Sequence, residues 1–210
     1  MIFNLRFIFL IFIVLSGYAY ARNQVDTAVT QVIPVDQLQG YKEYPLVVQQ
    51  LINSATQLTE KNLTYTYASA DPAAGGMDCS GTIYYLLTAA GIPNVPRQAN
   101  QIYQWVWEHG KFYSVTSNNF KSFEFSKLKP GDLLFWSGTY AVERDPPITH
   151  VMMYLGKDLQ NHHLMFGASD GRPYQGKKMN GVSVFDFTLP DGASSARFIG
   201  YSCIPTLTCN

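Results

Sequence analysis

Cys79 stands where a turn gives way to an apolar run, in "GGMDCSGTIYYLL" (residues 75–87). A cysteine at the start of a helix faces unsatisfied backbone N–H groups and the positive end of the helix dipole. Both favour the thiolate, the form that attacks a carbonyl, whereas the negative charge of Asp78 opposes it. Position alone leaves two interpretations open: a nucleophile, or a small buried thiol without reactivity.

A nucleophilic thiol also needs a base, and the chain has four histidines. His150 opens an apolar run directly after a proline-rich turn, so we expect its ring at the mouth of a sheet. His109 precedes a predicted helix-ending glycine, where a capping or surface role is favoured. His162 and His163 lack partners at the spacing of metal ligands, so we predict neither a metal nor a cofactor.

Three helices are expected before His150. Apolar residues three or four positions apart predict a helix that starts at Pro45. Residues 78–90 predict a second helix, capped by Asp78 and ended by Gly91. A third helix is expected after "VPRQ". The second of these would hold Cys79 in its first turn.

From about residue 112 the sequence changes to short apolar runs between turns, which predict an antiparallel sheet or half-barrel. These runs are "FYSVT", "DLLFWSG", "HVMMYLG", "LMFGAS", "GVSVFDF" and "ARFIGYSCI". Helices first and strands afterwards favour an α+β fold. We expect one catalytic domain over residues 63–210, preceded by a lead-in and helix over residues 22–62 that is too short for a second domain. An insertion at residues 139–147 precedes His150.

The bulk composition narrows the class of protein. At 210 residues the chain suits one sizeable domain, and 47% hydrophobic with 14% charged residues is typical of a globular protein. Lysine plus arginine equals aspartate plus glutamate, at 15 each. Because the chain has no net positive charge to attract polyanions, we predict no nucleic-acid partner.

Residues 1–21 are interpreted as a secretory signal peptide. Arg6 precedes an apolar run at residues 7–15, and Ala-Tyr-Ala at residues 19–21 matches a cleavage pattern. Because the run is short for a bilayer, we expect cleavage before Arg22, no stable membrane span, and a periplasmic or extracellular location. An uncleaved N-terminal anchor is the alternative.

Export changes how the three cysteines are interpreted. Cys203 and Cys209 could form a disulfide in an oxidising compartment and fix the C-terminal tail. Cys79 is then an unpaired thiol in a secreted protein, which calls for a functional explanation. Together with His150, this favours the nucleophile.

Five sequence blocks follow one another between about Tyr65 and Gly171: "MDCSGTIYYLLTAAG", "VPRQANQ", "LKPGDLLFW", "THVMMYLG" and "FGASDG". Their order and approximate spacing resemble those of the NlpC-type papain-like cysteine peptidases, a family of cell-wall hydrolases. Its members carry Asp-Cys-Ser-Gly at a helix start, Pro-Gly-Asp-Leu before a strand, and His-Val-x-x-Tyr-x-Gly on the next strand. The resemblance implies a papain-like core, with the nucleophile at a helix start packed on an antiparallel sheet.

The resemblance also implies roles for single residues. Cys79 matches the nucleophile and His150 the general base. Tyr65 matches a tyrosine that hydrogen-bonds near the reacting carbonyl, and Tyr67 is the alternative because ungapped counting reaches it. The oxyanion would be met by the backbone N–H of Cys79, with the Tyr65 hydroxyl as a candidate second donor.

The positions beside the nucleophile imply a substrate. Asp78 and Ser80 match residues that help to bind the free amine of a stem peptide, and for Arg97 a structural pairing role is weighed against substrate contact. The resemblance implies hydrolysis of peptidoglycan stem peptides between D-glutamate and a diaminopimelate-type residue. We expect the protein to be a monomer. Two alternatives stay open: a weak or inactive relative that binds wall peptides, and an amidase or acyltransferase with another secreted target.

The third catalytic position departs from the family pattern. Relatives place a polar residue, most often histidine, in His-Ala-Ser on the strand after the base, and here Gly167 occupies that slot in "FGAS". Ungapped counting offers His162 instead. His163, Ser169, a backbone carbonyl and a simple dyad are further possibilities, and the role is left unassigned.

Overall fold

The structure, a computed structural model, describes residues 27–209. The predicted signal peptide and its cleavage site lie outside this range. Among the described residues, no helix is long and apolar enough to cross a membrane.

The three predicted helices are present. Helix α1 spans Leu46–Thr59 and directs its apolar face into the core. Helix α2 spans Cys79–Ala89, and its N-cap is the predicted one: the Asp78 carboxylate accepts a hydrogen bond from the Gly81 N–H at 2.6 Å. Helix α3 spans Ala99–His109. Within residues 27–209 there are also four 3-10 helices: η1 (Val35–Gln37), η2 (Tyr41–Glu43), η3 (Pro72–Ala74) and η4 (Phe123–Phe125).

The later strands form one six-stranded sheet in the order β3-β8-β4-β5-β6-β7, in which all neighbouring strands are antiparallel. Their bounds are β3 Phe112–Ser114, β4 Leu133–Ser137, β5 Ile148–Lys157, β6 His163–Tyr174, β7 Lys177–Asp186 and β8 Arg197–Ser202. Each predicted apolar run contributes one strand. The α+β fold class, with a papain-like arrangement of helices and sheet, is confirmed.

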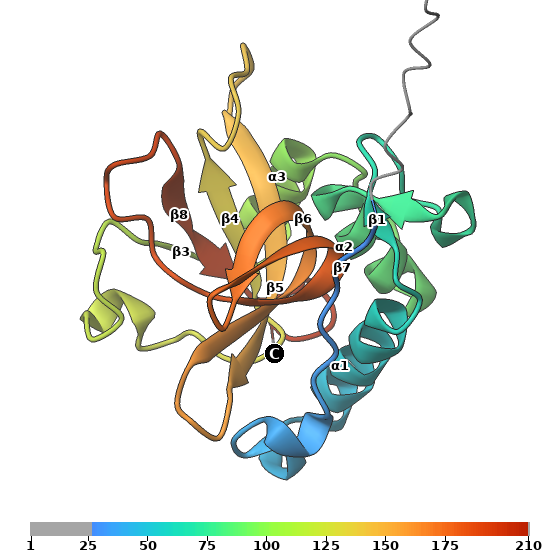
Figure 1. The fold of residues 1–210 in the computed structure, drawn as a ribbon. Helices are drawn as coiled ribbons and strands as arrows, with labels where there is room; N and C mark the ends of the chain where they lie inside the picture. The colour runs from blue at the N-terminus through green and yellow to red at the C-terminus, as the bar shows by residue number, and fades with distance from the viewer. Residues whose placement is uncertain (1–26, 210) are drawn as a thin grey trace, which may run out of the picture.

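The helices contact the second half of the sheet. Helix α2 contacts β5 and β6, α3 contacts β5, and α1 contacts β7. Figure 1 shows α1 and α2 beside β6 and β7, while the strands curve away toward β3 and β8. Strand β5 is buried along nearly its whole length, because α2 and α3 cover it and β4 and β6 flank it. The start of α2 therefore packs close to the sheet.

A short parallel pair leads into α2. Strand β1 (Thr64–Tyr65) pairs with β2 (Gly76–Met77), and Asp78 follows directly. A Cβ at Gly76 would lie 2.6 Å from the backbone oxygen of Thr64, so only glycine allows this close approach. The pair places Tyr65 beside the chain that enters α2.

The described part of the lead-in packs along the edge of the sheet. Val29 and Asn180 of β7 exchange two backbone hydrogen bonds, at 2.8 and 2.9 Å. Ile33 and Leu38 are buried in the main core. The lead-in therefore pairs with the outer strand and closes an edge that would otherwise present free backbone groups.

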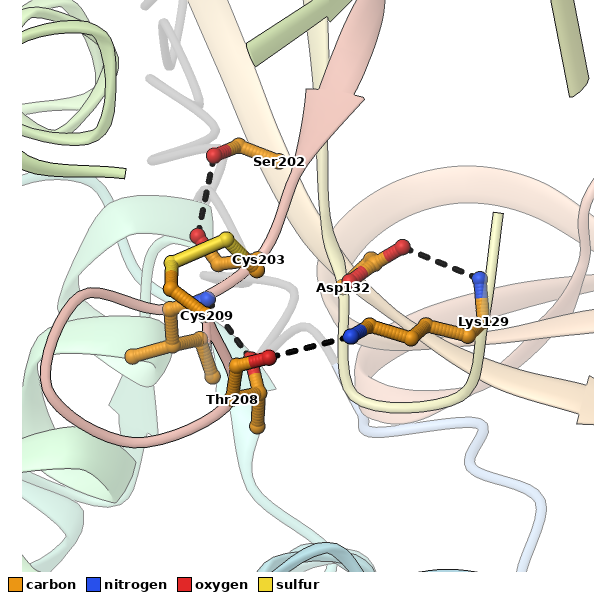
Figure 2. The surroundings of a disulfide bond; sticks show 7 residues. Lys129, Asp132, Ser202, Cys203, Thr208 and Cys209 are labelled. Atoms are coloured by element: carbon orange, nitrogen blue, oxygen red, sulfur yellow. Dashed lines mark hydrogen bonds between the residues drawn. A yellow bond between two sulfur atoms is a disulfide. The ribbon is translucent and has the colours of Figure 1, made fainter. Parts of the chain in front are cut away.

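The predicted disulfide joins Cys203 and Cys209, six positions apart in the sequence (Figure 2). Inside the loop, the Thr208 hydroxyl accepts a hydrogen bond from the Ile204 N–H at 2.8 Å. The Thr208 carbonyl accepts another from the Lys129 ammonium at 3.1 Å. The C-terminal loop is thus attached both to β8 and to the turn that precedes β4.

Candidate active site

Cys79 is the first residue of α2, and its side chain is buried, with 6% of the residue exposed. Its Sγ lies 4.0 Å from the backbone oxygen of Thr149, the residue before His150. The packing of α2 on β5 therefore brings the thiol to the stretch of strand that carries the candidate base.

Burial controls the protonation of the thiol. It raises the pKa of Cys79 to about 11, and the negative charge of Asp78 adds to the rise. Backbone hydrogen bonds and the Arg97 charge lower the pKa, but by less. The stabilisation of the thiolate expected from the helix start is thus outweighed, and the unliganded thiol is protonated at neutral pH.

His150 lies near the start of β5, with 6% of the residue exposed. Its ring packs edge-on against Trp136 of β4, with centroids 5.8 Å apart. Burial, followed by the charge of Arg172, holds the pKa of His150 well below its ordinary value. A neutral imidazole beside a neutral thiol suits general-base catalysis, in which the ring removes the thiol proton during attack.

Two cavities meet at this point. One, of about 270 Å³, is lined by Asp78, Cys79 and Ser80 among others. The other, of about 570 Å³, is lined by His150. Tyr65 lines both. The candidate nucleophile and base therefore open onto neighbouring halves of one cleft.

Tyr65 is half-buried, and burial, with the Cys79 charge as the next cause, raises its pKa. Its hydroxyl therefore stays protonated and able to donate a hydrogen bond. Tyr67, the alternative from ungapped counting, is 77% exposed. The surroundings favour Tyr65 as the donor near a reacting carbonyl.

Asp78 is tied into a network beside the thiol. Its Oδ1 accepts hydrogen bonds from the Gly81 N–H, the Ser80 hydroxyl and Arg97 Nη1, at 2.6, 3.3 and 3.0 Å. Its Oδ2 accepts one from Arg97 Nη2 at 2.9 Å. Arg97 thus has the structural pairing role that was weighed for it. Oδ2 accepts one hydrogen bond within residues 27–209 and keeps capacity for another, and Asp78 lines the smaller cavity.

At Gly167, the position expected for a third catalytic residue, the side chain of Met152 fills the adjacent space. A Cβ at Gly167 would lie 3.0 Å from Cγ of Met152, so the methionine occupies the space beside the glycine. His163 pairs with Lys157, seven residues along β5 from His150. At about 3.3 Å per strand residue, that is roughly 23 Å away. Both His162 and His163 already have partners at that far end.

Ser169 does lie near the base, because it lines the larger cavity together with His150. Within residues 27–209, however, the buried Nε2 of His150 has no hydrogen-bond partner. The ring of this candidate base therefore packs against Trp136, and over the same range no polar third residue binds its Nε2.

The structure adds two residues that sequence reasoning missed. Tyr140, in the insertion at residues 139–147, lines both cavities. Arg172 lines the larger one, and its guanidinium carbon lies 4.5 Å from the centre of the Trp136 ring. The position of the insertion just before His150 was a usable signal for Tyr140. No local sequence pattern predicted that Arg172 lines the cavity, because its position depends on a shift in the register between β6 and β7.

The sequence model of the NlpC/P60 family matches residues 62–181, more than half of the chain. The chain belongs to the NlpC/P60 family. Members of this family are cysteine peptidases, and the family indicates a peptidoglycan-related hydrolase activity. The match runs from β1 into the first part of β7 and includes Cys79 and His150, whereas residues 188–196 of the larger cavity lie beyond it. A comparison with curated proteins gave no match.

Proposed function

We propose that this NlpC/P60 protein is an exported cysteine endopeptidase that hydrolyses amide bonds in peptidoglycan stem peptides, between D-glutamate and a diaminopimelate-type residue. The observation that carries the proposal is the meeting of two cavities, one containing Cys79 and the other His150. A peptide lying across Tyr65 would present one amide to both groups.

The reaction follows from the protonation states. His150 takes the proton of the Cys79 thiol while Sγ attacks the amide carbonyl, and negative charge develops on the carbonyl oxygen. The backbone N–H of Cys79 at the helix start and the Tyr65 hydroxyl are the donors for that oxygen. The C–N bond then breaks and His150 gives its proton to the leaving amine. Water, activated by the same ring, hydrolyses the thioester and releases the acid.

The two cavities support one orientation of the proposed substrate. Because His150 protonates the leaving amine, the leaving fragment belongs in the larger cavity beside it. The acyl fragment then lies in the smaller cavity, near Asp78 and Ser80. There the available lone pair of Asp78 Oδ2 suits the free ammonium group of a stem peptide.

The test is incubation with a defined stem tetrapeptide, with the products read by mass spectrometry. Cleavage by the wild type and none by Cys79→Ala, at an unchanged melting temperature, supports the proposal. The product masses locate the bond. If the wild type leaves both peptidoglycan and the tetrapeptide intact, the hydrolase proposal fails.

One observation favours a second candidate, a relative that binds wall peptides without cutting them. The Nε2 of His150 has no partner among the described residues, so nothing polar fixes the ring tautomer. Binding of the tetrapeptide by the wild type without any cleavage over long incubation would select this candidate.

A further inference from the structure

The larger cavity contains cationic side chains that the proposed mechanism does not use. Arg172 and Lys178 line it together with a single carboxylate, Asp170. With His150 neutral, two positive charges face one negative charge, so the cavity carries a net charge of about +1. The half of the cleft assigned to the leaving fragment is therefore electropositive.

A β-bulge positions Arg172. Asp170 pairs with Asn180 and Pro173 pairs with Lys178, so two residues of β6 face a single residue of β7. Bulges of this kind redirect a side chain and are frequent next to functional sites. Here Arg172 is one of the two bulged residues of β6, and its guanidinium carbon lies over Trp136, 4.5 Å from the ring centre.

The same bulge makes room for Lys178. Gly171, the other bulged residue, has a φ of +139°, and a Cβ there would meet the Lys178 side chain. Because glycine stands at that position, the lysine can lie across the backbone toward the cavity. Both cations thus reach the cavity through one local irregularity of the β6–β7 pair.

Arg172 lacks an anionic partner within residues 27–209, where the ion pairs involve other residues. No hydrogen bond to a protein group satisfies its guanidinium there either, although the side chain is partly buried against Trp136. Burial lowers the pKa of Arg172 to about 10, which leaves it cationic at neutral pH. A partly buried cation without a partner gains from an anion that binds in the cavity.

We propose that Arg172 and Lys178 form a carboxylate-binding subsite for the amine-side fragment of the substrate. This inference rests on the proposed function for the direction of the substrate. The ligand is a carboxylate carried on the residue that supplies the leaving amine. The planar guanidinium can bind it through two parallel hydrogen bonds, with the Lys178 ammonium as a point charge beside it.

The test compares two peptides: L-alanyl-γ-D-glutamyl-meso-diaminopimelate and the same peptide with both diaminopimelate carboxyls converted to carboxamides. At pH 8, where His150 is neutral, we expect the wild type to show a KM at least about tenfold lower for the carboxylate peptide, as for a charge-assisted hydrogen bond. We expect Arg172→Gln to remove this difference in KM between the two peptides. Lys178→Gln should reduce the difference severalfold, and Arg172→Lys should retain part of it. Lys177→Gln, an exposed neighbour that does not line the cavity, leaves it unchanged.

A binding measurement separates this inference from the proposed function. Free meso-diaminopimelate is titrated into the wild type and into Arg172→Gln by calorimetry, with its diamide as the control. Weaker binding by the variant and by the diamide supports the subsite even if no peptide is cleaved. Cleavage of both peptides with equal KM by wild type and Arg172→Gln overturns the subsite and leaves the proposed function standing. Equal or absent binding of the free acid in both proteins also overturns the subsite.

Discussion

Arg97 holds both carboxylate oxygens of Asp78, with donor–acceptor distances of 3.0 and 2.9 Å. The same carboxylate caps α2 at Gly81 and raises the pKa of the Cys79 thiol, whereas the Arg97 charge lowers it. The pair therefore fixes the helix start and balances the charge next to the candidate nucleophile.

Arg97→Gln is expected to leave the Asp78 charge unopposed and to raise the pKa of the Cys79 thiol further. Alkylation by iodoacetamide should become severalfold slower at a fixed pH, with its pH profile displaced to higher pH. Arg97→Lys keeps the positive charge, so its alkylation rate should lie between those of the wild type and Arg97→Gln. An alkylation profile of Arg97→Gln that superimposes on the wild type would contradict this electrostatic role.

The pH dependence of activity should reflect the environment of His150. Because burial and the Arg172 charge lower its pKa, the acid limb of kcat/KM should lie below 6.5, the ordinary value for histidine. Removing the cation in Arg172→Gln should move that limb to higher pH. The measurement is kcat/KM from pH 4.5 to 8 for both proteins. A wild-type limb at or above 6.5 would be inconsistent with a buried neutral base.

Placing a histidine at position 167, where relatives carry the third catalytic residue, should by itself lower the stability of the protein. In Gly167→His the new side chain meets Met152, whose Cγ lies 3.0 Å from the position of a Cβ. Overpacking of this kind costs about 1–3 kcal/mol of unfolding free energy. Met152→Ala in the same chain makes room, so the double variant should lose less stability than the sum of the two single variants. Additive losses in urea denaturation would show that the two positions do not compete for space.

Asp132 should make stability depend on pH. It is 1% exposed, its Oδ2 accepts the Lys129 N–H at 2.9 Å, and burial raises its pKa to about 7. The folded state therefore holds its proton more tightly than the unfolded chain, and this contribution to stability is lost as pH rises through about 7. At about 1.4 kcal/mol per pKa unit, the loss is about 4 kcal/mol at most.

Asp132→Asn keeps an acceptor for the Lys129 N–H and cannot ionise. We expect the variant to gain stability relative to the wild type between pH 5 and pH 8, measured by urea denaturation at each pH. Comparison at matched pH cancels the contributions of the buried histidines, which titrate in both proteins. A stability difference that is constant over this range would contradict a buried carboxyl with a raised pKa.

The disulfide predicts a thiol count. Native or denatured protein without reductant should show one free thiol, Cys79, and reduced denatured protein should show three. Because the closed loop is short, reduction should cost only about 2 kcal/mol of unfolding free energy. Three thiols in unreduced denatured protein would rule out the Cys203–Cys209 bond.

Local sequence determined the elements that present the candidate nucleophile and base. Asp78 caps α2 and sets Cys79 in its first turn, because capping depends on residues only three positions apart. Short apolar runs between turns likewise predicted the strands, including β5 with His150 near its start. The order of motif blocks then predicted the family, which the match over residues 62–181 confirmed.

Tertiary structure decided the properties that depend on distant neighbours. The raised pKa of Cys79 comes chiefly from desolvation by the packed sheet, and packing cannot be read from the flanking residues. Met152 fills the space beside Gly167 because β5 and β6 adopt one particular register. Arg172 reaches the cleft through a bulge in the pairing of β6 with β7, and strand pairing is a relation between segments that neither segment encodes alone.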